Sequence, residues 1–511
     1  MPPSSEFSPL RASALDNALA HALALALALA LLLPAAGAAL QPGPSAGHLP
    51  VDLRLDSLSA EVDRLLDAWH RPDAPGAAVL VMKDGAVVHS RGYGMANLEQ
   101  GVPIRTTSVF DIASVSKQFA AFALALLEAD GRLEWDDPVH RHLPELADVG
   151  RDITLRHLVH HTSGIRDWPG TLAMAGWDYQ DVMSFEQILR MAFRQSELNF
   201  EPGAEYAYSN TGYNLLAEVV ARVSGTSFPA FTEERIFRPL GMTRTHFHDD
   251  HTEVVRDRAD SYRPAPGGAP GYRNVVNSLT ALGSSSLFTT VEDLARWMAN
   301  FDDPVVGDAR VFARMHARGV LNGGDTVAYA GGQSLGRFRG STRWSHTGSW
   351  AGYRTALFRH PDDAFAVVVL ANRADANPSA LADRITELYL AETLDPPVVA
   401  QEGDAAAGAG AGEDGTSAGP WAPSPEELTA YVGAFRSPET ESTFHLVVAD
   451  DGSLRAHHFR TGVRILRPVA PDRFEAPTLG EVIFARDGQG QITHFTANQP
   501  RIRGFRFDRL P

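Results

Sequence analysis

The stretch DIASVSKQFA, residues 111–120, places Ser114 three residues before Lys117 at the start of an apolar run. Lys117 and Lys83 are the only lysines in the sequence, whereas arginine is common. Residues three apart on a helix share a face, with Cβ atoms about 5–6 Å apart, so these two side chains can meet. Burial disfavours the charged form of a lysine, and a lysine in such a setting can take the proton of an attacking serine hydroxyl. An arginine could not do so, because a guanidinium stays protonated.

The start of a helix gives a nucleophilic serine a second advantage. Unpaired backbone N–H groups and the positive end of the helix dipole lie where an oxyanion would develop. With average serine usage, there is roughly a one in eight chance that either lysine has a serine three residues before it. The pair therefore needs support from elsewhere in the chain.

The first support is YAYSN, residues 206–210, just ahead of a helix that we expect to begin near Gly212. A tyrosine hydroxyl beside a lysine can become a phenolate or pass a proton to a leaving group, and an asparagine amide can hold a substrate carbonyl. Tyr208 and Asn210 are candidates for these roles. The alternatives are a core aromatic for Tyr208 and a helix N-cap for Asn210.

The second support is WSHTGS, residues 344–349, in an expected strand. A glycine there would let a substrate backbone lie against the strand. The backbone N–H of Ser349 could form an oxyanion pair with that of Ser114. The alternative is an exposed strand end with a solvated His346.

Together, Ser-x-x-Lys, Tyr-x-Asn and His-Thr-Gly resemble the three motifs of the penicillin-recognising serine hydrolases, in the branch of class C β-lactamases, D-alanyl-D-alanine carboxypeptidases and related esterases. Stretches such as LVHHTSGI and HTGSWAGYRT extend the likeness from about Asp56 to Leu394. The tail from Tyr431 to Phe507 is similar to a small β-barrel module that many members carry. The resemblance implies an α+β fold of the β-lactamase/transpeptidase type, an antiparallel sheet flanked by helices with a helical subdomain between Ser114 and Tyr208. A small C-terminal all-β barrel-like module would follow.

The resemblance also implies roles for individual residues. Ser114 would be acylated, Lys117 would accept its proton, and Tyr208 would be a second acid or base. The residues implied to bind substrate are Asn210, His346, Thr347, Gly348 and Ser349. No metal or organic cofactor is implied. Dedicated β-lactamases of the family usually have a lysine where this chain has His346, so we expect a peptidase or esterase rather than a dedicated β-lactamase.

Hydrophobic periodicity outlines the domains. Apolar residues at helical spacing predict helices over 53–69, 116–129, 154–160, 185–195, 212–224, 291–300 and 379–390. Alternation predicts a hairpin over 77–94, strands over 353–359 and 365–370, and several short strands after 425. The expected organisation is a signal peptide over 1–38, a hydrolase domain over 53–395, a linker over 401–424 and a β module over 425–511.

Composition narrows the partners and the compartment. The net charge is −17 without a basic block, so a nucleic-acid partner is not expected. The absence of cysteine excludes disulfides, thiolate metal sites and a cysteine nucleophile. An apolar run over 22–33 followed by Ala36-Gly37-Ala38 predicts an exported protein, periplasmic or secreted, with no membrane span after cleavage. A membrane anchor or a start codon placed too early is the alternative.

Three competing interpretations remain. Gly332-Gln-Ser334-Leu-Gly336 fits the Gly-x-Ser-x-Gly nucleophile elbow, which requires a strand before and a helix after, and the sequence predicts another strand instead. His157 and His161 lie four apart, as zinc ligands can, but no glutamate lies between them in the metalloprotease arrangement. Finally, the same motifs could belong to a receptor that is acylated without turnover, or to a binder of cell-wall peptides. The expected partner is a small molecule or a peptide, cell-wall peptides included.

Overall fold

The computed structural model describes residues 53–146, 149–396 and 421–511. The expected signal peptide and residues 401–420 of the expected linker lie outside the described residues. Arg54–Pro511 forms one compact unit. None of the described helices is both long enough and apolar enough to span a bilayer.

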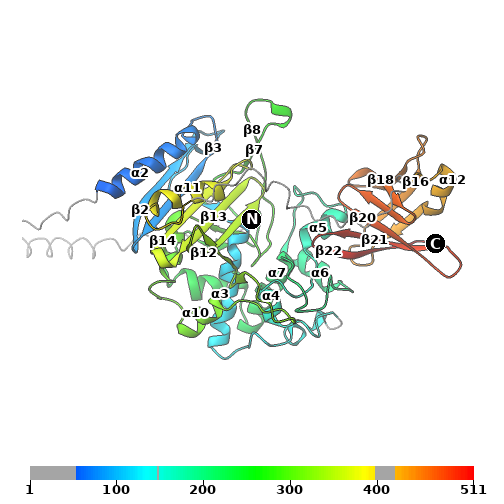
Figure 1. Ribbon diagram of the computed structural model, residues 1–511, viewed down its shortest axis with the longest axis horizontal. Helices are drawn as coiled ribbons and strands as arrows, with labels where there is room; N and C mark the ends of the chain where they lie inside the picture. Colours follow the sequence, from blue (N-terminus) through cyan, green and yellow to red (C-terminus); the bar gives the residue numbers. More distant parts are fainter. Residues whose placement is uncertain (1–52, 147–148, 397–420) are drawn as a thin grey trace, which may run out of the picture. The chain divides into compact units, whose positions relative to one another are not determined.

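A seven-stranded antiparallel sheet forms the centre of the part that precedes residue 397 (Figure 1). Its order is β10-β11-β12-β13-β14-β1-β2, and its strands are β1 (Ala77–Lys83), β2 (Ala86–Tyr93), β10 (Tyr329–Ala330), β11 (Gln333–Phe338), β12 (Ser341–Trp350), β13 (Tyr353–His360) and β14 (Phe365–Ala371). The predicted hairpin is β1–β2, and the two predicted later strands are β13 and β14. Every residue of β14 is buried, because helices cover both faces of the sheet.

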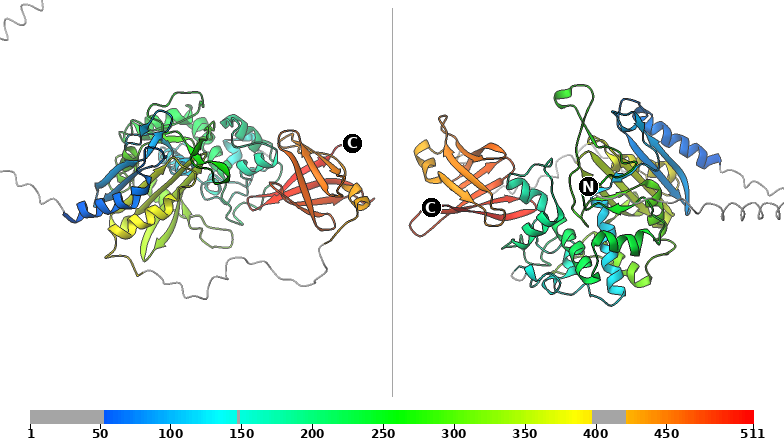
Figure 2. Two further views of the ribbon diagram at one scale, coloured as in Figure 1. Left: turned by 90° about the horizontal axis from the view of Figure 1, so that it is seen from above. Right: turned by 180° about the vertical axis from the view of Figure 1, so that it is seen from behind.

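The two faces carry different helices. Figure 2 shows the blue helix α2 (Leu53–Leu66) and the yellow helix α11 (Pro378–Tyr389) on one face, where they pack on apolar residues of β1 and β14. The opposite face packs on α9 (Val291–Ala299) and on α3 (Lys117–Ala129). Eleven of the thirteen residues of α3 are buried, which explains its nearly unbroken apolar sequence.

The helical subdomain and the remaining short elements complete this part of the chain. The other helices are α4 (Leu155–Val159), α5 (Trp168–Met174), α6 (Phe185–Phe193), α7 (Asn210–Ser224), α8 (Phe228–Thr232) and α10 (Ala309–His316). The short strands are β3 (Met95–Asn97), β4 (Val102–Pro103), β5 (Phe110–Asp111), β6 (His246–Phe247), β7 (Tyr262–Pro264), β8 (Tyr272–Asn274) and β9 (Leu287–Thr289). Helix α7 begins at Asn210 rather than near Gly212, and its N-cap is Ser209, whose side chain accepts the N–H of Gly212. The N-cap alternative for Asn210 is therefore wrong by one residue.

The C-terminal module is a closed eight-stranded antiparallel barrel. After α12 (Pro425–Leu428), its strands are β15 (Gly433–Arg436), β16 (Thr443–Val448), β17 (Leu454–His458), β18 (Gly462–Ala470), β19 (Arg473–Ala476), β20 (Gly480–Arg486), β21 (Ile492–Gln499) and β22 (Ile502–Arg509). Strand β15 pairs with β22, so the barrel has no free edge. Aromatic side chains from most of these strands fill its interior, which leaves a packed core rather than a channel.

A buried ion pair joins the barrel to the helical subdomain. The guanidinium of Arg166, which is 2% exposed, donates from Nη1 to Glu439 Oε1 at 2.7 Å, and Glu439 is 5% exposed. Arg166 also donates to the backbone oxygens of Arg503 and Gly504 in β22. This contact fixes the β21–β22 turn, which contains Arg501, beside the segment that follows Arg166.

Candidate active site

Ser114 lies in a short 3-10 turn, Ala113–Ser116, that runs directly into α3. Ala113 has a φ of 47°, a left-handed conformation that is costly for a residue with a Cβ. The buried carboxylate of Asp111 holds this backbone by accepting the Ala113 N–H at 2.7 Å. Burial raises the pKa of Asp111 to about 6. The strained turn leaves the Ser114 side chain partly exposed beside a cavity.

Lys117 is 0% exposed, and its Nζ contacts three oxygen atoms. Nζ donates to Asn210 Oδ1 at 2.7 Å and to the carbonyl oxygen of Ser284 at 2.8 Å, and it lies 3.2 Å from Ser114 Oγ. The first two oxygens only accept hydrogen bonds. In a neutral amine they therefore take both N–H groups, and the lone pair faces Ser114. Burial holds the pKa of Lys117 well below its usual value, which makes the neutral form more accessible.

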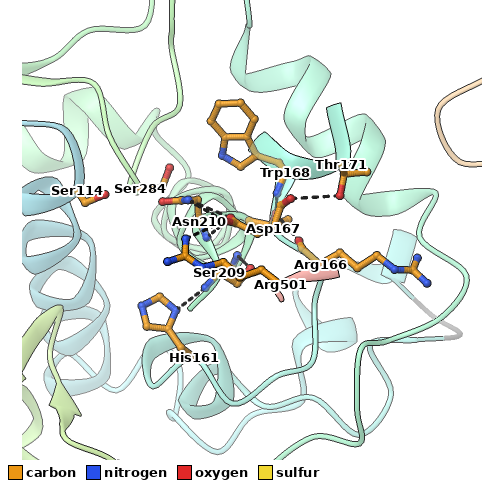
Figure 3. Close-up of polar contacts among 12 residues, drawn as sticks. Ser114, His161, Arg166, Asp167, Trp168, Thr171, Ser209, Asn210, Ser284 and Arg501 are labelled. Carbon is orange, nitrogen blue, oxygen red and sulfur yellow. Dashed lines mark hydrogen bonds and ion pairs between the residues drawn. The ribbon is translucent and has the colours of Figure 1, made fainter. Parts of the chain in front are cut away.

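Behind the lysine lies a buried carboxylate that the sequence analysis did not identify. Figure 3 shows Asn210 and Arg501 converging on Asp167. Asn210 donates its backbone N–H and its side-chain amide to Asp167 Oδ1, at 2.8 and 2.9 Å. Arg501 Nη1 is 3.3 Å from Asp167 Oδ2. Because the amide nitrogen of Asn210 is taken by Asp167, its oxygen is directed at Lys117.

The ring of Tyr208 lies close to two cations. Its centroid is 4.8 Å from Lys117 Nζ and 4.9 Å from Arg501 Cζ. Burial raises the pKa of Tyr208 above its usual value, against the smaller opposing effect of a hydrogen bond with Ser114. The side chain is therefore a neutral phenol near pH 7. The sequence left two forms open for Tyr208, a phenolate and a protonated hydroxyl. The structure favours the protonated hydroxyl, which can donate its proton.

Strand β12 presents the third motif with alternating orientation. Thr347 and Ser349 are exposed, whereas His346 and Gly348 are buried. The pairing of β11 with β12 ends at Ser345. Beyond that residue, β12 has no partner on this side among the described strands, so an extended substrate could lie along it.

Gly348 was expected to make room for a substrate backbone, but the structure shows that it makes room for the protein's own backbone. A Cβ at this position would lie 2.2 Å from the carbonyl oxygen of Ile112 and 2.2 Å from Thr355 Oγ1. The missing side chain thus faces the turn that carries Ser114, not the cavity. The glycine lets β12 pack directly on the backbone that precedes Ser114.

His346 is a neutral, buried side chain. Its Nε2 is 3.1 Å from Tyr329 Oη, and its Nδ1 is 2.7 Å from the carbonyl oxygen of Thr347. Burial and then the nearby Lys117 lower its pKa to about 3. The alternative of a solvated histidine is therefore wrong, and the charge at this position does not change near neutral pH.

A cavity of about 570 Å³ opens beside Ser114, within the range of small-molecule sites. Its lining includes Asn210, Ser349, Trp350, Arg354 and Arg501. A larger cavity of about 720 Å³ surrounds Glu128, Arg132 and Arg314 and contains none of the three motifs. The smaller cavity is the one with reactive groups.

The competing serine and the histidine pair have structural positions. Ser334 lies inside strand β11, paired with Ser345, so the strand-turn-helix setting of an elbow is missing. His157 accepts the Thr154 N–H through Nδ1 and caps α4. His161 Nδ1 accepts the Ser209 N–H at 3.1 Å (Figure 3). The two histidines do not form a metal pair.

This fold and the Ser-Lys-Tyr arrangement define a serine hydrolase. The chain belongs to the Beta-lactamase family, whose model matches residues 62–392. It is 31% identical over 319 residues to penicillin-binding protein 4* of Bacillus subtilis (strain 168), covering 58% of this chain and 68% of that protein. It is 27% identical over 322 residues to a D-aminopeptidase of Gluconobacter oxydans (strain 621H), covering 63% of this chain and 60% of that protein.

Solved structures show the same fold. The octameric penicillin-binding protein homologue from Pyrococcus abyssi matches with a TM-score of 0.58 and 22% identity, over 89% of this chain and 99% of that one. D-amino acid amidase from Ochrobactrum anthropi SV3 matches with a TM-score of 0.56 and 24% identity, over 65% of this chain and 98% of that one. The family resemblance and the α+β fold inferred from the sequence are thereby confirmed.

Proposed function

We propose that the protein is an exported peptidase that cleaves amide bonds at D-amino acids through an acyl-enzyme on Ser114. The observation that carries this proposal is the 3.2 Å contact between Ser114 Oγ and Nζ of the buried Lys117. The relatives named D-aminopeptidase and penicillin-binding protein support an amide substrate. The apolar run over 22–33 supports export.

The proposed reaction begins with attack of Ser114 Oγ on the substrate carbonyl carbon while its proton passes to Lys117 Nζ. The carbonyl oxygen becomes an oxyanion that the backbone N–H groups of Ser114 and Ser349 stabilise. The C–N bond then breaks as the Tyr208 hydroxyl gives its proton to the leaving amine and regains one from Lys117. Water hydrolyses the resulting ester with the same groups, which return the proton to Ser114.

The charges around the cavity favour a substrate with a free carboxylate. Three arginines line it, Arg263, Arg354 and Arg501, against the two acids Asp167 and Asp178. Arg354, the register partner of Ser349, lines the same cavity as Ser114, so its guanidinium could pair with a substrate carboxylate there. We propose a peptide ending in a D-residue carboxylate, as in cell-wall peptides, as the preferred substrate.

The decisive experiment uses the full chain with four substrates: a peptide ending in D-Ala-D-Ala, its C-terminal amide, p-nitrophenyl acetate and a chromogenic cephalosporin. We expect turnover of the free-acid peptide with kcat/KM roughly tenfold or more above that of the amide. Ser114→Ala should abolish turnover, and Ser334→Ala should keep it. A single stoichiometric burst would identify a receptor, and activity that survives Ser114→Ala would refute the assignment.

A further inference from the structure

A second cluster of reactive side chains lies on strand β6 and the turn after it. His246 is the first residue of β6, and His248 is the first residue after that strand. Their ring centroids are 5.7 Å apart. Glu253 completes the group, and one ligand atom from each of the three residues lies within 4.8 Å of the others.

Three ring nitrogens of this cluster have no hydrogen-bond partner among the described residues. His248 is 2% exposed, and within the described residues neither of its ring nitrogens has a hydrogen-bond partner. Nε2 of His246 is also buried without a partner. Glu253 Oε2 is 3.7 Å from His248 Nδ1, outside hydrogen-bond distance. Buried polar groups in native proteins are nearly always paired, so these nitrogens call for a ligand.

The surrounding structure holds the three side chains in place. Strand β6 pairs with β9, and the His248 N–H donates to the Ser286 carbonyl oxygen at 2.9 Å. The ring of Phe288 packs against both imidazoles. The Glu253 N–H donates to the Asp250 carbonyl oxygen at 3.0 Å, which fixes the turn.

We propose that His246, His248 and Glu253 bind a divalent transition-metal ion, with zinc the best fit. Two imidazoles and one carboxylate are donors that zinc accepts, and the fourth position would be open to water. Tetrahedral bonds of about 2.0–2.1 Å place ligand atoms about 3.3 Å apart. The ligand atoms now lie up to 4.8 Å apart. A rotamer change of Glu253, whose side chain is 57% exposed, can bring its carboxylate to the shorter spacing.

The bound ion would be structural. It would tie the Asp250–Glu253 turn to β6 and thus to β9. The carbonyl that holds Lys117 belongs to Ser284, two residues before the Ser286 carbonyl that pairs with His248. The inference does not depend on the proposed function, because the cluster touches none of the residues assigned to the reaction. The sequence suggested only His157 and His161 as possible zinc ligands, although the His-x-His spacing of residues 246 and 248 is also a sequence signal for metal binding.

The test measures metal binding by the full chain after dialysis against a chelator. Titration with zinc chloride should show one site per chain and raise the thermal midpoint, and cobalt(II) should give the visible absorption of tetrahedral coordination. Glu253→Gln, at an exposed side chain, should weaken zinc affinity at least tenfold, and His248→Ala should abolish the site. His251→Ala is the matched control, since His251 is exposed in the same turn and belongs to no ligand group; it should bind normally.

Two results would overturn the proposal. One is zinc binding by the wild type no tighter than by Glu253→Gln and His248→Ala. The other is a loss of zinc affinity in His251→Ala as large as that in Glu253→Gln and His248→Ala, which would assign zinc binding to surface histidines. Neither readout uses hydrolysis, so failure here is separate from failure of the peptidase assignment.

Discussion

At the scale of single residues, the proposed reaction of Ser114 depends on the protonation state of Lys117. Two buried carbonyl oxygens fix the direction of its N–H groups, and burial disfavours its charge. Two further charges act on it in opposite directions: Asp167 raises its pKa, and Arg501 lowers it. The pH dependence of the reaction is therefore set partly by residues that touch neither Ser114 nor the attacked carbonyl.

Substitution of these two charged residues should shift the acidic limb of kcat/KM in opposite directions. Asp167→Asn removes the charge that favours the ammonium, so Lys117 loses its proton more readily and the limb moves to lower pH. Arg501→Gln leaves Asp167 unopposed, and the limb moves to higher pH. Arg501→Lys keeps the charge and should leave the limb in place. A pH profile for each variant checks this, and shifts in the same direction would contradict it.

Local spacing was sufficient to predict the contact between Ser114 and Lys117, because both residues lie within one turn of chain. The same reasoning could not find Asp167. Its partners Asn210 and Arg501 are brought to it by tertiary packing, and an aspartate before a helix is ordinarily explained as an N-cap. The expected role of Asn210 as a substrate ligand stays a prediction, and its observed contacts are with Lys117 and Asp167.

At the scale of elements, the site depends on the contact between strand β12 and the turn before α3. This contact needs Gly348, because any side chain there meets the Ile112 carbonyl oxygen. It sets the distance between the backbone N–H groups of Ser114 and Ser349. The geometry of the proposed oxyanion site is thus a matter of how closely two elements pack.

Gly348→Ala should therefore lower kcat/KM by roughly 100-fold, since displacements of about 1 Å have effects of this size. It should also cost about 1–3 kcal/mol of unfolding free energy through overpacking. Gly336→Ala is the matched control, because no atom lies within 4 Å of a Cβ at Gly336 in the neighbouring strand. Steady-state kinetics and urea unfolding measure both effects. Equal behaviour of the two variants would show that the close approach is unimportant.

Periodicity located the long helices and, in the main sheet, β1, β2, β13 and β14 to within a few residues. It missed α5, α8 and α10, each of eight residues or fewer. Helices this short are formed by tertiary contacts more than by their own sequence pattern. Periodicity also could not show that the pairing between β11 and β12 ends at Ser345 of β12, because the register of a strand depends on its partner.

At the scale of the whole molecule, the barrel is part of the hydrolase site. The alternating segments after 425 predicted a β module, but pairing of β15 with β22 joins residues far apart in sequence and could not be seen from alternation alone. Docking through Arg166 and Glu439 brings Arg501 into the cavity.

Buried histidines should make the whole protein sensitive to acid. Burial lowers the pKa of His160 and His360 to about 4 and that of His346 to about 3. The unfolded chain binds these protons near pH 6.5 and the folded chain does not. Each histidine therefore reduces the unfolding free energy by up to about 1.4 kcal/mol per pH unit as the pH falls from about 6.5 towards 4. Asp111, with a raised pKa, acts in the opposite direction.

Urea unfolding between pH 7 and 4.5 measures this loss. His360→Gln removes one of the contributing groups, so its unfolding free energy should fall less steeply with decreasing pH. His445→Gln, at an exposed position on β16, should keep the slope of the wild type. A wild-type stability that is constant over this interval would contradict the assignment of neutral buried histidines.

The placement of the two lysines bears on how the protein responds to chemical labelling. The Lys117 amine has no exposed surface, whereas the Lys83 side chain at the end of β1 is 24% exposed. Reagents that acylate or carbamylate amines thus find one accessible lysine in the described structure. A dye, a tether or a solid support attached by such chemistry would mark that one corner of the sheet, and the amine beside the nucleophile would escape modification for as long as the surrounding residues stay closed.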